Sequence, residues 1–314
     1  MEDIIRAIED FRREWRSDSP YVLAHTSGST GKPKSIRLSK SDMAVSARAT
    51  ISRFGINSES RIAAALSPEY IAGKMMIVRG ELAACGVVPV PVESCPDLSH
   101  VGHLDILAIV PAQIDGVLRQ SADIANLLVG GAPMDEAQRA AVVASGICAW
   151  ESYGMTETCS HVALRRVTDD LDSPFIAMPG FSFATDTRGC LRILSDEFSW
   201  RELVTNDCVE LIDARSFRWK GRFDNVIISG GLKLHPEILE KEYAPALGGR
   251  NFYVCGRPDE KWGTAVVLVV EGDAIEGLDK KIASVVADRR RLPKAIIYKS
   301  GLPRTPNGKI IRTC

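Results

Sequence analysis

The sequence predicts an α/β protein: a large N-terminal domain of mostly parallel sheets covered by helices, then a small mobile α+β C-terminal domain. Up to Trp150, short continuous apolar runs alternate with helical segments, which is typical of parallel strands buried on both faces. The 314 residues, 45% of them hydrophobic, suffice for about two domains. The pattern changes to short β segments from about Phe181, and we expect the two domains to be residues 1–223 and 224–314.

The expected elements follow from periodicity and from start and stop signals. Ile4, Ile8 and Phe11 recur at helical spacing and predict an amphipathic N-terminal helix. The segment 39–42, Ser-Lys-Ser-Asp, is similar to a capping box, so a helix is expected to begin there and to stop at Gly55. Further strands are expected at 21–24, 62–66, 87–90, 106–110, 126–129, 148–150, 252–255 and 265–270, and further helices at 71–84, 113–120, 135–144, from 236 onward and at 279–290.

The segment from His25 to Lys34, His-Thr-Ser-Gly-Ser-Thr-Gly-Lys-Pro-Lys, follows the first expected strand, which we expect to be buried. Its glycines permit positive φ, so that successive backbone N–H groups can point toward an anion. Its hydroxyls and lysines add donors and positive charge. The segment therefore predicts a loop that binds a polyphosphate, although the spacing is not that of a Walker loop. A flexible surface linker is the alternative.

Two further segments follow expected strands: the turn 130–132, Gly-Gly-Ala, and the run 151–158, Glu-Ser-Tyr-Gly-Met-Thr-Glu-Thr. Ligands of parallel sheets lie in the crevice beyond the carboxyl ends of the strands. All three segments should therefore meet at one crevice. The aromatic ring and the carboxylate of the run 151–158 suit a nucleotide base and a magnesium ion on its phosphates.

Composition excludes several classes of partner. The 39 basic and 40 acidic residues give a net charge of −1, which favours neither nucleic acid nor an anionic membrane. No apolar run reaches the roughly 18 residues of a membrane helix, and the acidic N-terminus is unlike a signal peptide. The eight scattered cysteines form no C-x-x-C pair, so we expect core thiols, no disulfide framework and a cytoplasmic location. A homo-oligomer is compatible with this composition.

Five motifs in the same order are similar to those of the adenylate-forming superfamily, which includes acyl-CoA synthetases, peptide-synthetase adenylation domains and luciferases. They lie at 26–34, 153–157, 205–207, 221–224 with 229–231, and 306–309. The resemblance implies ATP and Mg²⁺ as cofactors, CoA as cosubstrate and a small-molecule carboxylic acid as partner. The compact chain and the sequence of residues 153–160, Tyr-Gly-Met-Thr-Glu-Thr-Cys-Ser, most resemble bacterial o-succinylbenzoate–CoA ligases of menaquinone biosynthesis. An ATP-dependent acid–CoA ligase is therefore expected.

The resemblance also implies a role for each matching residue. The phosphates of ATP would be held by the loop residues Thr26, Ser27, Gly28, Ser29, Thr30, Gly31 and Lys34. Adenine would be surrounded by Gly131, Ala132, Glu151, Ser152 and Tyr153. The acid and CoA would lie against Tyr70, Gly73, Gly154, Ser229, Gly230 and Gly231.

The remaining roles concern catalysis and movement. Thr156 would contact the α-phosphate and Glu157 would bind Mg²⁺, while Asp207 and Arg222 would bind the ribose hydroxyls. The catalytic residues would thus be Thr156, Glu157 and, on the small domain, Lys309, with Asp224 as the hinge. We expect the acyl pocket between the helical segment 70–84, the turn 130–132 and the segment 153–161.

Two departures from the resemblance leave alternatives open. Only 25 residues precede the loop, whereas most members of the superfamily have a large segment there. Tyr70 stands where the o-succinylbenzoate ligases usually carry a histidine. An amino-acid adenylating enzyme would need a carboxylate for the substrate's ammonium, and Glu69 is the acid in the stretch that would supply it. Other aryl acids and fatty acids also remain candidate substrates. The joint presence of Lys309 and the other predicted catalytic and nucleotide-binding residues argues against a non-catalytic relative.

Overall fold

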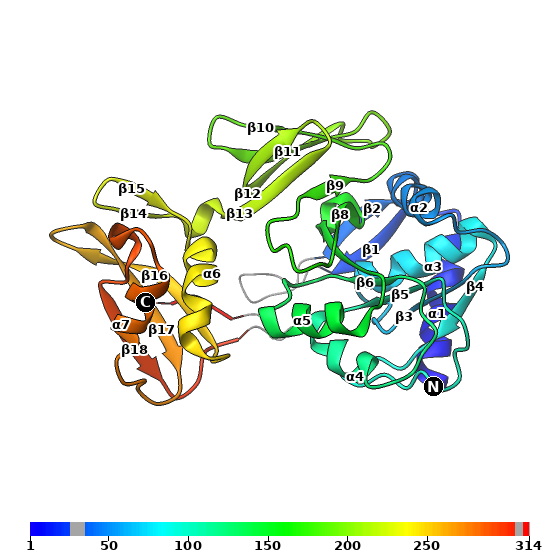
Figure 1. Ribbon diagram of the computed structural model, residues 1–314. Helices are drawn as coiled ribbons and strands as arrows, with labels where there is room; N and C mark the ends of the chain where they lie inside the picture. Colours follow the sequence, from blue (N-terminus) through cyan, green and yellow to red (C-terminus); the bar gives the residue numbers. More distant parts are fainter. Residues whose placement is uncertain (26–34, 305–309, 314) are drawn as a thin grey trace. The chain divides into compact units, whose positions relative to one another are not determined.

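The computed structural model describes residues 1–25, 35–304 and 310–313, and these form two compact units (Figure 1). Unit 1 comprises residues 1–184, 193–203 and 211–218; unit 2 comprises 185–192, 204–210 and the chain from Trp219 onward. Two short segments from earlier in the chain thus belong to the C-terminal unit. The functional boundary and hinge at Asp224 stay predictions.

The expected helices and strands occur in the expected order, and further strands that were not expected lie among them, for example at 35–39, 161–166 and 295–299. The helices are α1 (Glu2–Arg16), α2 (Lys40–Phe54), α3 (Ile71–Ala83), α4 (Ile114–Leu118), α5 (Glu136–Ser145), α6 (Pro236–Leu247) and α7 (Leu278–Val285). The strands are β1 (Tyr21–His25), β2 (Ser35–Ser39), β3 (Arg61–Ala64), β4 (Gly86–Pro89), β5 (Ile106–Ile109), β6 (Leu127–Val129), β7 (Ala149–Gly154), β8 (His161–Arg166), β9 (Phe175–Ala177), β10 (Ser182–Thr185), β11 (Cys190–Leu194), β12 (Glu202–Asp213), β13 (Ser216–Arg222), β14 (Ile227–Ser229), β15 (Leu232–Leu234), β16 (Phe252–Asp259), β17 (Gly263–Glu271) and β18 (Ala295–Lys299).

The main sheet has the strand order β10-β11-β12-β13-β9-β8-β7-β6-β5-β3-β4. The five strands from β4 to β7 pair in parallel, whereas β8 and β9 continue the sheet in antiparallel pairing. The predicted α/β class is thereby confirmed. The antiparallel extension that begins with β8 was not predicted.

Strand β1 differs from the prediction. It pairs antiparallel with β2 in a separate two-stranded sheet, and its residues Tyr21 and Leu23 are 49% and 54% exposed. Among residues 21–24, only Val22 and Ala24 are buried, so the expectation of a buried strand is wrong for the two residues that alternate with them. The segment 26–34 therefore does not follow a strand of the parallel sheet, and the argument from carboxyl ends applies only to the other two segments.

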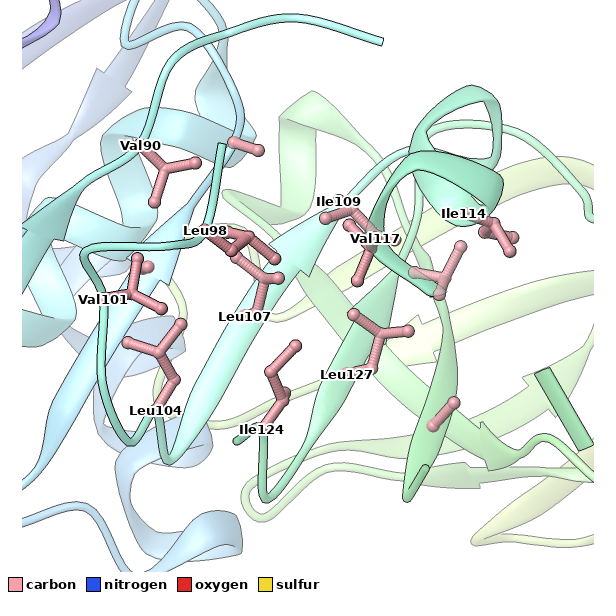
Figure 2. Packing of buried hydrophobic residues seen from close by; sticks show 14 of the residues in the cluster. Val90, Leu98, Val101, Leu104, Leu107, Ile109, Ile114, Val117, Ile124 and Leu127 are labelled. Atoms are coloured by element: carbon pink, nitrogen blue, oxygen red, sulfur yellow. The ribbon is translucent and has the colours of Figure 1, made fainter. Parts of the chain in front are cut away.

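The core of unit 1 forms where apolar residues of the parallel strands meet the segment that precedes β5. Leu107 and Leu127 of the adjacent strands β5 and β6 belong to one cluster with Leu98, Val101 and Leu104, and Figure 2 shows Leu107 between these residues and Leu127. All four residues of β5 are buried, because a central parallel strand is covered on both faces. This packing fixes the strand ends that carry the candidate site.

The start and stop signals of the helices are met in part. Oγ of Ser39 accepts a hydrogen bond from the backbone N–H of Asp42, and Gly55 ends α2 with φ of 65°. Helix α7 ends at Val285, five residues before the predicted end. Asp288 begins a separate 3-10 turn by accepting from the N–H of Arg290, and Pro293 disfavours a helical conformation just before it.

Unit 2 contains the three-stranded sheet β16-β17-β18, and its core lies between this sheet and helices α6 and α7. Six cysteines of the described chain are free thiols: Cys85, Cys95, Cys148, Cys159, Cys190 and Cys208. Cys255 is disulfide-bonded, so the expectation of a thiol is wrong at that position. Among the described residues, no helix is long and apolar enough to cross a membrane.

Candidate active site

The carboxyl ends of β6 and β7 bring two of the predicted nucleotide-binding segments together. Val129 and Glu151 are register partners, and Oγ of Ser152 donates to the carbonyl of Val129 over 3.1 Å. A Cβ at Gly130 would lie 2.4 Å from Oγ of Ser152, so a larger residue there would displace the Ser152 side chain. Gly131 has φ of +84°. The turn 130–132 and Ser152 are therefore adjacent, as the adenine site requires.

The carboxylate of Glu151 is occupied by the protein itself. It is buried and accepts hydrogen bonds from Nη2 of Arg139 at 2.6 Å and from Nε of Arg165 at 2.8 Å. Two guanidinium groups surround this single buried carboxylate, so its charge is fully compensated and the cluster keeps one net positive charge. Glu151 can therefore serve a nucleotide through its backbone, while its side chain joins α5 to β8.

The ring of Tyr153 belongs to an aromatic cluster. Its centroid lies 5.8 Å from that of Phe175 and 5.1 Å from that of Phe217, the latter edge to face. Such packing fixes the plane of the ring. Tyr153 is half-buried, so part of the side chain remains accessible to a ligand.

The segment after β7 holds the predicted catalytic pair Thr156 and Glu157 in a 3-10 turn. Oγ1 of Thr158 accepts from the N–H of Met155 at 3.0 Å, and the carbonyl of Glu157 accepts from Nε1 of Trp200 at 3.2 Å. These contacts fix the backbone and leave the Glu157 side chain exposed. Magnesium binds through one or two carboxylates with substrate phosphates and water, so one accessible carboxylate fits this ion.

The predicted ribose-binding residues lie together in unit 2. Oδ1 of Asp207 accepts from Nε1 of Trp219 at 3.1 Å and lies 3.5 Å from Nη1 of Arg222. Nη2 of Arg222 lies 3.3 Å from Oδ2 of the predicted hinge Asp224, which also accepts from Asn206. Arg222 therefore links the candidate ribose site to the candidate hinge.

The glycines predicted to face the acid or CoA are sites of close packing. A Cβ at Gly73 would lie 2.3 Å from the carbonyl oxygen of Ser67, and a Cβ at Gly154 would lie 2.2 Å from that of Ser160. Gly230 has φ of +54° and donates its N–H to the carbonyl of Trp262 at 2.9 Å. These positions allow close backbone approach whether or not a ligand binds.

Three further predicted residues occupy defined places. Tyr70 is 42% exposed at the N-terminus of α3. Ser229 is the last residue of β14, and Gly231 follows it in the turn to β15 with φ of +80°. The phosphate-loop residues 26–31 and Lys34, together with the catalytic Lys309, lie outside the described residues.

A buried network of polar side chains, Arg79, Ser160, His161 and Thr50, joins α3, β8 and α2, and sequence reasoning missed it. Arg79 is 2% exposed, and its Nη2 donates to Oγ of Ser160 at 2.7 Å. Ser160 lies 3.2 Å from Nδ1 of His161, whose Nε2 lies 3.1 Å from Oγ1 of Thr50. The sequence signal was an arginine that directly follows the apolar run 75–78, in a helix whose residues 73–80 are all buried.

The donors and acceptors of this buried network can be assigned in one consistent way. Oγ1 of Thr50 donates its proton to the carbonyl of Ser46, so it accepts from Nε2–H of His161. Nδ1 of His161 then accepts from Ser160, which accepts from Arg79. Burial, and then the nearby charge of Arg79, lower the pKa of His161 well below its usual value, in agreement with a neutral ring.

Comparison with known proteins identifies the class. Residues 6–185 match the family model described as AMP-binding enzyme, and the chain belongs to this family. The prediction of an adenylate-forming enzyme is thereby confirmed. A crystal structure of an acyl-CoA synthetase (AMP-forming)/AMP-acid ligase II-like protein from Dyadobacter fermentans is 32% identical, covers 98% of this chain and 92% of its own, and has a TM-score of 0.66.

Two curated relatives differ in the acid that they use. The long-chain-fatty-acid–CoA ligase FadD13 of Mycobacterium tuberculosis is 25% identical over 96% of this chain and 68% of its own length. The 2-succinylbenzoate–CoA ligase of Enterococcus faecalis is also 25% identical, over 97% of this chain and 70% of its own. The family is thus clear, and the acid has to be inferred from the site.

Proposed function

We propose that this protein is an ATP-dependent acid–CoA ligase and that its acid is o-succinylbenzoate, an intermediate of menaquinone biosynthesis. In the first half-reaction an oxygen of the acid's carboxylate attacks the α-phosphorus of ATP, and pyrophosphate leaves. In the second half-reaction the thiol of CoA attacks the acyl carbon, AMP leaves and a thioester forms. The relatives named above, which are ligases of carboxylic acids and CoA, support this reaction class.

The residue roles in this proposal follow the predicted motifs. Asp207 would accept from the ribose hydroxyls with Arg222 beside it, and the turn 130–132 would lie against adenine. Glu157 would hold Mg²⁺, which supplies charge neutralisation on the phosphates. Lys309 would stabilise the negative charge that gathers around phosphorus during attack. The phosphate loop 26–34 would hold the leaving pyrophosphate.

The observation that supports the choice of acid is the buried guanidinium of Arg79. No carboxylate lies within ion-pair distance of it among the residues that the structure describes, and burial lowers its pKa to about 9. A buried charge without a counter-ion is costly, and buried charges are normally paired. A carboxylate on the ligand would supply the missing partner.

Arg79 also joins two of the three segments that were predicted to enclose the acyl group. It lies on α3, within the segment 70–84, and its hydrogen bond to Ser160 reaches the segment 153–161. o-Succinylbenzoate has two carboxylates, so one can be activated while the other pairs with a cation. A long-chain fatty acid has one carboxylate and would leave the guanidinium unpaired.

An amino acid fits this environment less well. Its ammonium would need a carboxylate in the acyl pocket, and the positive charge of Arg79 would repel it. Glu69, the acid considered for that role, is exposed and lines a cavity of about 590 Å³ beside α1 instead. The amino-acid alternative is therefore disfavoured.

ATP–pyrophosphate exchange tests the proposal with o-succinylbenzoate, two analogues that each lack one of its carboxylates, a long-chain fatty acid and amino acids. We expect the fastest exchange with the diacid. Arg79→Met should lower kcat/KM for the diacid by about 10- to 150-fold, the range for a hydrogen-bonded charge. The same variant should change little for the analogue that lacks the unreacted carboxylate.

Arg79→Lys is the matched control, because it retains the charge while losing the planar fork. It should recover part of the activity toward the diacid. Faster exchange with the fatty acid or an amino acid, or an equal loss for diacid and analogue in Arg79→Met, would contradict the choice of acid.

A further inference from the structure

A cavity of about 270 Å³ lies on unit 1 beside the start of the parallel strand β7 and the end of its antiparallel neighbour β8. It is lined by Arg53 of α2, Trp150 of β7 and Arg166 of β8, and by residues 173, 174, 176 and 177. Trp150 precedes Gly154 by four residues, which is about 13 Å along a strand. The cavity therefore lies away from the predicted acyl pocket, and the proposed ligase reaction does not use it.

Trp150 provides a fixed aromatic face in this cavity. Its Nε1 donates to Oδ1 of Asn126 at 3.1 Å, and the ring of Phe54 meets it edge on at 6.1 Å between centroids. These two contacts hold the indole in one orientation. The ring is half-buried, so one part remains accessible.

Two guanidinium groups lie over this tryptophan. The Cζ atoms of Arg53 and Arg166 lie 4.5 Å and 5.4 Å from the ring centroid. Arg166 also donates to the sulfur of Cys148. Neither arginine has a carboxylate within ion-pair distance in the described part of the chain. Two neighbouring positive charges repel each other, and an anion between them would remove that repulsion.

The rest of the lining is apolar, with one unsatisfied hydroxyl. Leu164, Pro174 and Ile176 line the cavity, and Ile176 is 49% exposed. Oγ of Ser173 is buried and has no hydrogen-bond partner among the described residues. A buried hydroxyl without a partner is rare in folded proteins, and an oxygen acceptor on a ligand would satisfy it.

We propose that this cavity binds a small aromatic carboxylate, with the acid group between Arg53 and Arg166 and the ring against Trp150. The volume lies just below the roughly 300–1,000 Å³ of small-molecule sites, so the ligand has one or two rings. Planar guanidinium groups bind carboxylates in the plane of the fork, and the indole face suits an aromatic ring. The site is independent of ATP and of the proposed reaction.

Nuclear magnetic resonance on the full chain tests this site with 2-naphthoate as the probe. The indole N–H signal of Trp150, assigned with Trp150→Phe, should shift and saturate as the probe is added. Arg53→Gln and Arg166→Gln should each raise the dissociation constant of the probe at least about tenfold, the lower range for a charge-assisted hydrogen bond. The neutral 2-naphthamide should bind at least about tenfold more weakly than 2-naphthoate.

Arg48→Gln is the matched control, because Arg48 is an exposed arginine on α2 that does not line the cavity. It should change the dissociation constant by less than about twofold. An unshifted Trp150 signal up to about 10 mM probe would overturn the proposal. Unchanged affinity in the double variant that combines Arg53→Gln with Arg166→Gln would also overturn it. So would a shift that depends on protein concentration and therefore reports self-association.

Discussion

Nη2 of Arg79 lies 2.7 Å from Oγ of Ser160, which places a buried positive charge one residue from the buried imidazole of His161. The imidazole can accept no second proton without adding a charge beside that of Arg79. Its pKa is therefore well below the ordinary value, first because of burial and then because of Arg79. The folded protein keeps His161 neutral at neutral pH.

The first prediction concerns the stability of the protein at mildly acidic pH. His161 takes up a proton near pH 6.5 in the unfolded chain and not in the folded one, so the unfolded state binds more protons below that pH. Its contribution is fully present above about pH 6.5 and is lost as the pH falls, by at most about 1.4 kcal/mol per unit. Urea denaturation across this range measures the slope, which should decrease in His161→Gln.

His103 provides a comparison of opposite sign. Its hydrogen bond to Asp123 raises its pKa, so its contribution to stability is present below about pH 6.5 and is lost as the pH rises through the folded value. His103→Gln should alter the dependence only in that higher range. If His161→Gln retains the full dependence of unfolding free energy on pH below about pH 6.5, the buried network around His161 is not the origin of that dependence.

Much of the fold could be predicted because the signals are local. The apolar stripe of α1, the cap at Ser39 and the stop at Gly55 depend on residues within one or two helical turns. The parallel strands read as continuous apolar runs because both of their faces are buried. Strand β8 was missed although four of its residues are buried and its partner β7 ends close by at Gly154. The connection between the two strands contains a 3-10 turn instead of a two-residue hairpin turn, so the usual sequence signal of a hairpin is lacking.

The candidate site could be predicted only where its residues lie within short sequence motifs. The adjacency of the turn 130–132 and Ser152 follows from neighbouring parallel strands. The double ion pair of Glu151 could not be foreseen, because Arg139 and Arg165 come from a helix and a strand on either side of it in sequence. That Arg79 has no carboxylate within ion-pair distance in the described part of the structure likewise could not be predicted, because its spatial neighbours come from other parts of the sequence.

The second prediction concerns Gly154, where β7 meets the start of β8. A Cβ there would lie 2.2 Å from the carbonyl oxygen of Ser160 and 2.6 Å from Cα of His161, and backbone cannot move aside cheaply. Gly154→Ala should destabilise the protein by about 1–3 kcal/mol, the cost of overpacking. Urea denaturation measures this change.

Gly86→Ala is the control for that substitution. The nearest atom to a Cβ at Gly86 is 3.8 Å away, an ordinary contact, so stability should change by less than about 0.5 kcal/mol. Equal losses in the two variants would show that the close approach at Gly154 is not the cause.

The third prediction separates the half-reactions at Lys309. If its ammonium stabilises the charge that gathers around phosphorus, Lys309→Ala should slow formation of the acyl-adenylate by about 10²–10³-fold and leave ATP affinity little changed. A supplied acyl-adenylate should still react with CoA at a nearly normal rate. Single-turnover assays of each step measure this. Equal failure in both steps, with the variant folded, would refute the assignment.

The last prediction concerns Asp224 as a hinge between the two half-reactions. Large domain movements need a change of φ and ψ at a few residues, and proline fixes φ near −65°. Asp224 is the second residue of the 3-10 turn Phe223–Asn225, where a backbone N–H has no partner within the turn, so Asp224→Pro removes no hydrogen bond of that turn. It should slow thioester formation more than adenylate formation. Asp224→Ala also loses the contacts with Asn206 and Arg222 but leaves φ at residue 224 unrestricted by a ring, so it isolates their effect. If proline and alanine slow both steps alike, the side chain at 224 matters through those contacts and the hinge lies elsewhere.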